Sequence, residues 1–130
     1  MTDPIGDMLS RIKNAQGIRA NTVDVPHSKE KAAILHILSS VGYVEKVEEM
    51  KRMEKKILRV GLKYRANKKG LIAGFKRISR PGRRIYTDAS KLPRVQSGFG
   101  TAVISTSKGI MTEQSARTQK LGGEVMLYVW

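Results

Sequence analysis

Apolar residues change their spacing along the chain from a helical to a strand period, and this change limits the available folds more than any other feature. Two early stripes have the three- and four-residue spacing of a helix face: Ile5, Met8, Leu9 and Ile12, then Ile34, Ile37, Leu38 and Val41. Asp3 and Pro4 are typical start signals for the first helix, and Gly17 is a stop signal. Ser28 and Gly42 bound the second in the same way.

Alternation of apolar and polar residues predicts strands in much of the remaining chain. The expected strands are residues 22–26, 43–47, 58–64, 71–79, 84–87, 102–105, 109–111 and 124–130. A charged turn is expected over residues 48–56, and Arg80-Pro81-Gly82-Arg83 has the proline and glycine of a type II turn. Thr112 is the expected cap of a short helix that ends before Gly122-Gly123.

A polar, aperiodic segment at residues 65–70 is the expected boundary between two units. Residues 1–65 then form an N-terminal α/β unit with two helices and three strands. Residues 66–130 form a mostly β C-terminal unit with one short helix. The predicted fold class is α+β.

Positive charge is the strongest global property of the chain. Lys and Arg total 25 against 11 Asp and Glu, for a formal net charge of +14. Residues 1–65 hold 13 basic and 8 acidic residues, a net of +5, whereas residues 66–130 hold 12 basic and 3 acidic residues, a net of +9. Self-repulsion on this scale destabilises a compact state, so a polyanion is the natural partner. The alternative is a basic protein that is merely soluble.

Composition also argues against several other classes of protein. The chain has no cysteine, which excludes disulfides and thiolate metal sites. No apolar run approaches the ~20 residues of a membrane span, and the opening MTDPIGDML has acids where a signal peptide has bases. Helix 3–17 has few bases opposite its apolar stripe, so binding to a membrane surface is not favoured either. We expect a cytoplasmic protein.

Catalytic readings are weak. Ser105 and Lys108 match the Ser-x-x-Lys pattern of penicillin-binding enzymes, but Gly109 follows at once, the flanks read as strand, and the companion motifs are absent. His27 and His36 are the only histidines, which makes a poor set of metal ligands or bases. We therefore predict no enzyme activity, no metal and no cofactor.

Nucleic acid is the partner that remains. Ser105, Thr106, Ser107 and Lys108 form the tip of a predicted hairpin, where hydroxyl groups can both donate to and accept from base edges, phosphates and ribose 2′-hydroxyls. Basic residues cluster at 68–69, 76–77 and 80–84, with Tyr86 just beyond, so we expect residues 66–130 to be the RNA-binding unit. Guanidinium groups bind phosphate with two donors, and a tyrosine ring can stack on a base. Because duplex RNA hides its major-groove edges, we expect such a tip to bind a minor groove or a distorted segment.

Several segments resemble the family of small-subunit ribosomal protein eight. The segment from Gly100 to Arg117, GTAVISTSKGIMTEQSAR, is similar to the signature of that family. The opening from Asp3 to Ala15, the turn Ser79-Arg80-Pro81-Gly82 and the closing GGEVM resemble it too. The likeness extends over essentially the whole chain.

This resemblance implies a structural, non-enzymatic protein of the ribosome in the cytoplasm, monomeric when free. It would bind the central domain of the small-subunit rRNA, help to nucleate assembly beside neighbouring ribosomal proteins, and repress translation of its own operon mRNA. It assigns Ser105, Thr106 and Ser107 to the distorted core of an RNA helix, with Glu124 nearby and Tyr86 packed on the RNA. Basic residues such as Lys29 and Lys55 would contact further RNA elements. The predicted binding residues also include Lys108 of the hairpin tip and Arg83 and Arg84 of the basic cluster. A generic basic nucleic-acid-binding protein is the alternative.

Overall fold

The computed structural model describes residues 3–64 and 72–130 of the chain. It divides into two compact units. The N-terminal unit comprises residues 4–72, and the C-terminal unit comprises residues 73–130 together with the first three residues. The predicted boundary segment, residues 65–70, lies outside the described residues.

Two helices form within the described part of the N-terminal unit, close to where apolar spacing predicts them. Helix α1 spans Pro4–Gly17 and α2 spans Lys29–Ser40. The Ser28 side chain accepts a hydrogen bond from the Lys31 backbone N–H at 3.1 Å, which confirms Ser28 as the N-cap of α2. The predicted stripe of α1 is buried, including Ile12. The predicted stripe of α2 is buried only in part: Ile34 and Leu38 are fully buried, but Val41 follows the helix and is 43% exposed, and Leu35 takes a core position instead.

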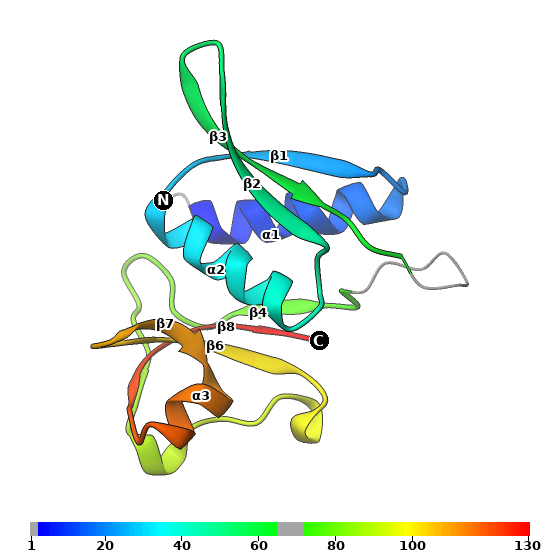
Figure 1. The fold of residues 1–130 in the computed structure, drawn as a ribbon. Coiled ribbons are helices and arrows are strands. Elements are labelled where there is room, and N and C mark those ends of the chain that lie inside the picture. The colour runs from blue at the N-terminus through cyan, green and yellow to red at the C-terminus, as the bar shows by residue number, and fades with distance from the viewer. Residues whose placement is uncertain (1–2, 65–71) are drawn as a thin grey trace. The chain divides into compact units, whose positions relative to one another are not determined.

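The same unit contains an antiparallel sheet with strand order β1-β3-β2 among its described residues. Strand β1 spans Thr22–Pro26, β2 spans Lys46–Arg52 and β3 spans Lys55–Gly61. Helix α1 packs near β1 and α2 near β2, and Val25, Leu58 and Val60 bring the sheet's buried face to the core. Beyond the helices, β2 and β3 continue as a two-stranded ribbon (Figure 1).

The ribbon corrects one expectation. Most of the charged segment 48–56 is strand rather than turn, and only Met53 and Glu54, with φ of 52° and 67°, reverse the chain. Residues 51 and 52 pair with 56 and 55, so charged side chains lie opposite each other on exposed arms. Backbone hydrogen bonds suffice for such pairing, and no apolar alternation marks it in the sequence.

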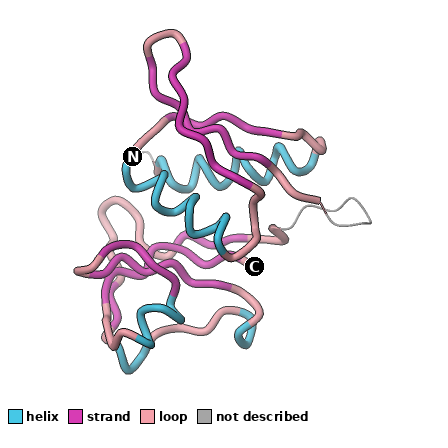
Figure 2. Tube along the Cα trace, in the orientation of Figure 1, coloured by secondary structure: helices cyan, strands magenta, loops and turns pink. Residues whose placement is uncertain are grey.

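The C-terminal unit is built mainly from strands, joined by short helical turns (Figure 2). Its antiparallel sheet has the order β4-β8-β6-β7 within residues 73–130, and β5 also pairs with β8. The elements are β4 Phe75–Arg77, β5 Tyr86–Thr87, β6 Thr101–Thr106, β7 Gly109–Thr112, α3 Glu113–Thr118, β8 Gly123–Val129 and 3₁₀ turns at Ala89–Lys91 and Gln96–Gly98. Of the predicted strand 71–79, only β4 is strand, and residue 71 lies outside the described residues.

Local signals in this unit are confirmed. The Thr112 hydroxyl accepts a hydrogen bond from the Ser115 N–H at 3.1 Å and caps α3. Gly82 has a φ of 86°, as position three of a type II turn requires. Leu92, Val95, Ala102, Ile104, Ala116 and Val125 form a buried cluster on which Tyr128 and Trp130 pack. Helices, antiparallel sheets and this division of elements confirm the α+β class.

A β-bulge in β8 determines which side chains face this cluster. Val103 pairs with Leu127, but the next residue, Ile104, pairs with Val125, so Met126 is the extra residue. Simple alternation would place Glu124 on the same face as Tyr128. The bulge instead turns Val125 toward the core and Glu124 to the opposite face.

Candidate nucleic-acid interface

The hairpin between β6 and β7 has a compact tip. Thr106 pairs with Gly109, which leaves Ser107 and Lys108 as a two-residue loop. The Thr106 hydroxyl donates to the Gly109 carbonyl oxygen at 2.8 Å and accepts from the Lys108 backbone N–H at 3.1 Å. Gly109 has a φ of 113°, which side-chain-bearing residues rarely adopt. The Thr106 hydroxyl therefore holds the turn, while the side chains of Ser107 and Lys108 are exposed.

Next to this tip, four residues form one row across the sheet. Tyr86 pairs with Glu124, Glu124 with Ser105, and Ser105 with Ile110. Directly paired residues of an antiparallel sheet project from the same face. Tyr86 is 70% exposed, an unusual amount for an aromatic ring, and Ser105 is partly exposed. The structure thus brings four of the predicted binding residues, Tyr86, Glu124, Ser105 and Thr106, onto adjoining positions.

Two glycines let the strands beneath the tip approach closely. A Cβ atom at Gly123 would lie 2.2 Å from the Ser105 carbonyl oxygen, and one at Gly122 would lie 2.5 Å from the Thr87 carbonyl oxygen. Both distances are far inside van der Waals contact with backbone atoms, which cannot rotate away. Gly122-Gly123 was predicted only to end a helix, so sequence reasoning missed this second role.

Glu124 has a partner inside the chain. Its carboxylate accepts a hydrogen bond from Arg84 Nη1 at 3.1 Å, with 19% of the Glu124 side chain and 48% of the Arg84 side chain exposed. A carboxylate beside an RNA site repels phosphate unless a donor satisfies it. Arg84 supplies such a donor, so Glu124 does not need a base amine for that purpose. The pair also fixes Arg84 beside the row of Tyr86 and Ser105.

Arg83 lies at the end of the turn that precedes this pair. Backbone hydrogen bonds of 2.9 Å run in both directions between Arg80 and Arg83 across Pro81-Gly82.

Arg77, the last residue of β4, is buried and donates from Nε to an Asp3 carboxylate oxygen at 3.0 Å. The Arg77–Asp3 pair was not foreseen, because its partners are separated by 74 residues. Arg77 is therefore structural, whereas the Arg83 side chain is exposed.

Lys29 and Lys55 belong to the N-terminal unit. Lys29 opens α2, Lys55 opens β3, and both are exposed. The His27 N–H donates to the Lys56 carbonyl oxygen at 3.2 Å, which joins the segment before α2 to the start of β3. This bond places the two predicted lysines on neighbouring segments of the chain.

An ion-paired cluster occupies the exposed face of that unit's sheet. Arg59 donates to both carboxylate oxygens of Asp24, at 2.8 and 3.1 Å, and Arg52 Nη1 lies 3.3 Å from the same carboxylate. The hydrogen bond from Arg59 lowers the pKa of Asp24, against a smaller opposing effect of burial. Asp24 in turn raises the pKa of Arg59. These two arginines are thus partly neutralised within the chain.

Residues 3–64 and 72–130 hold no group of three or more His, Asp or Glu side chains arranged to bind a metal ion. None of the helices in the same ranges has the length and apolar character needed to cross a membrane.

Comparison with known proteins gives a consistent result over the whole chain. Residues 3–130 match the family described as "Ribosomal protein S8". The chain is 55% identical to "Small ribosomal subunit protein uS8" of Caldanaerobacter subterraneus subsp. tengcongensis, over 100% of this chain and 98% of the relative. It is 50% identical to the protein of the same name from Acetivibrio thermocellus, over 99% of this chain and 98% of the relative. It is 49% identical to the protein of the same name from Bacillus cereus (strain B4264), over 100% of this chain and 98% of the relative.

Proposed function

The chain belongs to the ribosomal protein S8 family, and we propose that it binds ribosomal RNA as a structural component of the small ribosomal subunit. Proteins of this family are structural rather than enzymatic, and this chain is not an enzyme. Its own residues then act by binding, without making or breaking covalent bonds.

The observation that carries the proposal is the row of exposed groups next to the hairpin tip. Tyr86 offers an aromatic face, Ser105 in β6 and Ser107 in the adjoining loop offer hydroxyl groups, and close backbone packing at Gly123 holds β6 against β8. A rigid set of donors, acceptors and one ring suits unstacked or distorted ribonucleotides, whose edges are open. Thr106 contributes by holding the turn, and its oxygen retains a free lone pair for the RNA.

Charge supplies most of the affinity in this proposal. Lys108 at the tip, Arg83 on the preceding turn and Arg84 next to Glu124 release counterions when they contact phosphates. Glu124 orients Arg84 and accepts from a base amine or ribose hydroxyl where the RNA offers one. Lys29 and Lys55 bind further RNA elements from the N-terminal unit.

The proposal extends to the place and role of binding. The target is a helix in the central domain of the small-subunit rRNA, where the chain, monomeric when free, helps to nucleate assembly and meets neighbouring ribosomal proteins. A similar RNA structure in the mRNA of its own operon would allow it to repress translation. The site then works in the cytoplasm, on ribosomes and on this message.

Nuclease footprinting tests the proposal directly. The purified chain is added to full-length small-subunit rRNA in the presence of excess tRNA and duplex DNA. The expected result is one protected segment in the central domain that survives the competitors. Protection that disappears with either competitor would instead favour a generic basic nucleic-acid-binding protein. The operon mRNA, probed in the same way, should show a single protected segment of similar secondary structure.

A further inference from the structure

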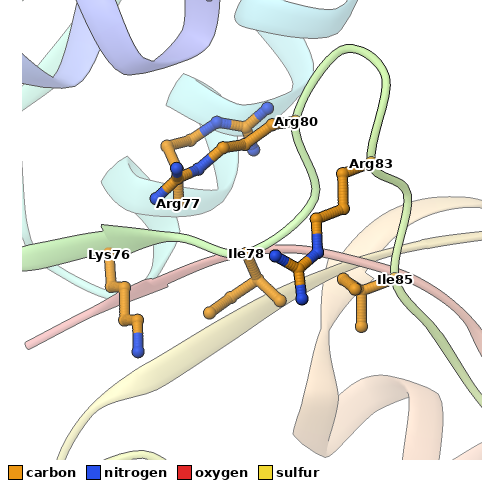
Figure 3. A pocket seen from close by; sticks show the side chains of 6 residues that line it. All are labelled: Lys76, Arg77, Ile78, Arg80, Arg83 and Ile85. Atoms are coloured by element: carbon orange, nitrogen blue, oxygen red, sulfur yellow. The ribbon is translucent and has the colours of Figure 1, made fainter.

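The C-terminal unit has a basic pocket that the hairpin tip does not include. It is lined by Lys76, Arg77, Ile78, Arg80, Arg83 and Ile85 and has a volume of about 340 Å³ (Figure 3). Ile78 and Ile85 give it an apolar wall, and the remaining lining residues are cations. In Figure 3, the Arg83 side chain extends from the turn toward the two isoleucines. The pocket therefore combines positive charge with an apolar surface.

Three of these cations have no carboxylate partner. Arg77 pairs with Asp3, but none of the ion pairs formed within residues 3–64 and 72–130 involves Lys76, Arg80 or Arg83. Arg80 and Arg83 face each other as a bridged antiparallel pair, where like charges repel and lower stability. An anion bound between them would remove this repulsion.

The turn that carries these arginines is rigid. The Ser79 hydroxyl donates to the Ile85 carbonyl oxygen at 3.2 Å and accepts from the Ile85 N–H at 2.9 Å. Ser79 is 1% exposed, and the Arg80–Arg83 backbone bonds close the turn above it. The backbone that carries Arg80 and Arg83 is therefore fixed before any ligand arrives, which lowers the entropic cost of binding.

The pocket lies in the same unit as the proposed RNA surface. Arg83 precedes Arg84, whose partner Glu124 belongs to the row of Ser105 and Tyr86. We infer that the pocket receives one unstacked nucleotide of the bound RNA, with its phosphate on Arg80 and Arg83 and its base against Ile78 and Ile85. This inference rests on the proposed function and adds a second point of contact to it.

The chemistry favours a nucleotide over an acidic protein segment. Arginine guanidinium groups bind a phosphate with paired donors, and their planar faces stack on bases. Pockets for small ligands begin at about 300 Å³, and the apolar wall leaves space beyond what a phosphate group alone would fill. A carboxylate side chain would leave that wall unused.

The test uses the full chain with ¹³C-labelled isoleucine methyl groups and ¹⁵N-labelled amides, in complex with a transcript of the small-subunit central domain. On saturation, ring currents from a stacked base should shift the methyl signals of Ile78 and Ile85 upfield. The Arg80→Gln/Arg83→Gln variant should lose these shifts and bind the transcript at least about tenfold more weakly. The matched control is Lys91→Gln/Arg94→Gln, which removes two exposed charges outside the pocket. It should keep the shifts and lose less affinity.

Each other outcome overturns the inference in a recognisable way. If the amide of Ser107 shifts with RNA but the two methyl signals do not, the tip binds and the pocket stays empty. If the methyl shifts persist in Arg80→Gln/Arg83→Gln, or both double variants lose equal affinity, the arginines do not hold the nucleotide. If poly-glutamate shifts the methyl signals and RNA does not, the partner is a protein. If no signal responds to RNA, the proposed function fails as well.

Discussion

Gly123→Ala tests whether RNA recognition depends on the position of the hairpin tip, because it moves the tip without changing the groups that would contact RNA. It changes no hydroxyl or charged group and adds one methyl group beneath the hairpin. That Cβ would lie 2.2 Å from the Ser105 carbonyl oxygen and 3.2 Å from the Thr106 Cα atom. To reach an ordinary contact of 3.4 Å, the two strands must separate by about 1.2 Å next to the tip. Relief by side-chain rotation is not available, because the contacted atoms are backbone.

The size of the effect follows from this displacement. Forcing a methyl group into a packed site costs about 1 to 3 kcal/mol of unfolding free energy. A hydrogen bond that is lengthened by ~1 Å no longer forms, and its loss from a buried contact costs about 1 to 3 kcal/mol. We therefore expect the affinity for the central-domain RNA to fall by about 10- to 100-fold. Binding to a scrambled RNA should stay unchanged, since every charge is still present.

The assay is filter binding of both RNAs at one fixed salt concentration, with thermal unfolding measured in parallel. Gly17→Ala is the control, because a Cβ there meets nothing within 4 Å. The variant's midpoint should fall by roughly 3 to 5 °C per kcal/mol lost, as is usual for a chain of this size. Unchanged affinity for the central-domain RNA, together with a lowered midpoint, would refute the idea that tip geometry determines recognition. Equal losses on both RNAs would show that the variant is merely unfolded.

Three further predictions concern single side chains. Thr106→Val removes both hydrogen bonds that hold the turn, so the unfolding free energy should fall by about 1 kcal/mol and lower the urea midpoint at constant m, and an unchanged midpoint would contradict a holding role. Arg84→Gln should weaken all RNAs alike and reduce the slope of log K against log salt by about 1, and a loss confined to one RNA would assign Arg84 to base recognition instead. Because Arg59 lowers the pKa of folded Asp24, that pair stabilises the fold above the ordinary carboxyl pKa of about 3.9 and this stability is lost as pH falls through the lowered value. Asp24→Asn should therefore be less stable at pH 7 and show a shallower acid limb of unfolding free energy, whereas parallel curves would contradict the pairing.

Local signals in the sequence predicted the elements that depend on local chemistry. Ser28 and Thr112 cap their helices by hydrogen bonds to N–H groups three residues away, and Gly82 completes a turn of four residues. The stripe of α1 is buried as its spacing predicts, and so are Ile34 and Leu38 of the α2 stripe. In each case the interaction that stabilises the element joins residues that are close together in the sequence.

Features that depend on strand pairing were missed. The β2–β3 ribbon has charged arms without apolar alternation, and such a pattern predicts a turn rather than strands. Alternation over 124–130 also gives no sign of the bulge at Met126, which turns Glu124 away from the core. The carbonyl of that extra residue accepts from the Ile78 N–H at 3.1 Å and from Arg77 Nη1, partners that lie about 50 residues earlier.

The candidate site shows the same division. The hydroxyl residues of the tip are contiguous in sequence and were identified from it, although their contacts with RNA stay predictions. The Arg84–Glu124 pair joins residues 40 apart, and the close approach at Gly123 depends on register between β6 and β8. Neither has a local signal. Both change the interpretation, since Glu124 is satisfied within the chain and the tip's position depends on a glycine.

The central claim is that a rigid hydroxyl tip on a cationic scaffold recognises an irregular RNA. The most direct measurement is the ratio of Kd for scrambled RNA to Kd for the central-domain RNA, at physiological salt, for the natural chain and for Ser105→Ala/Ser107→Ala. The account predicts a large ratio for the natural chain that falls toward one in the double variant, while the Kd for scrambled RNA stays the same. A ratio near one for the natural chain, or an equally large ratio in both proteins, would contradict it.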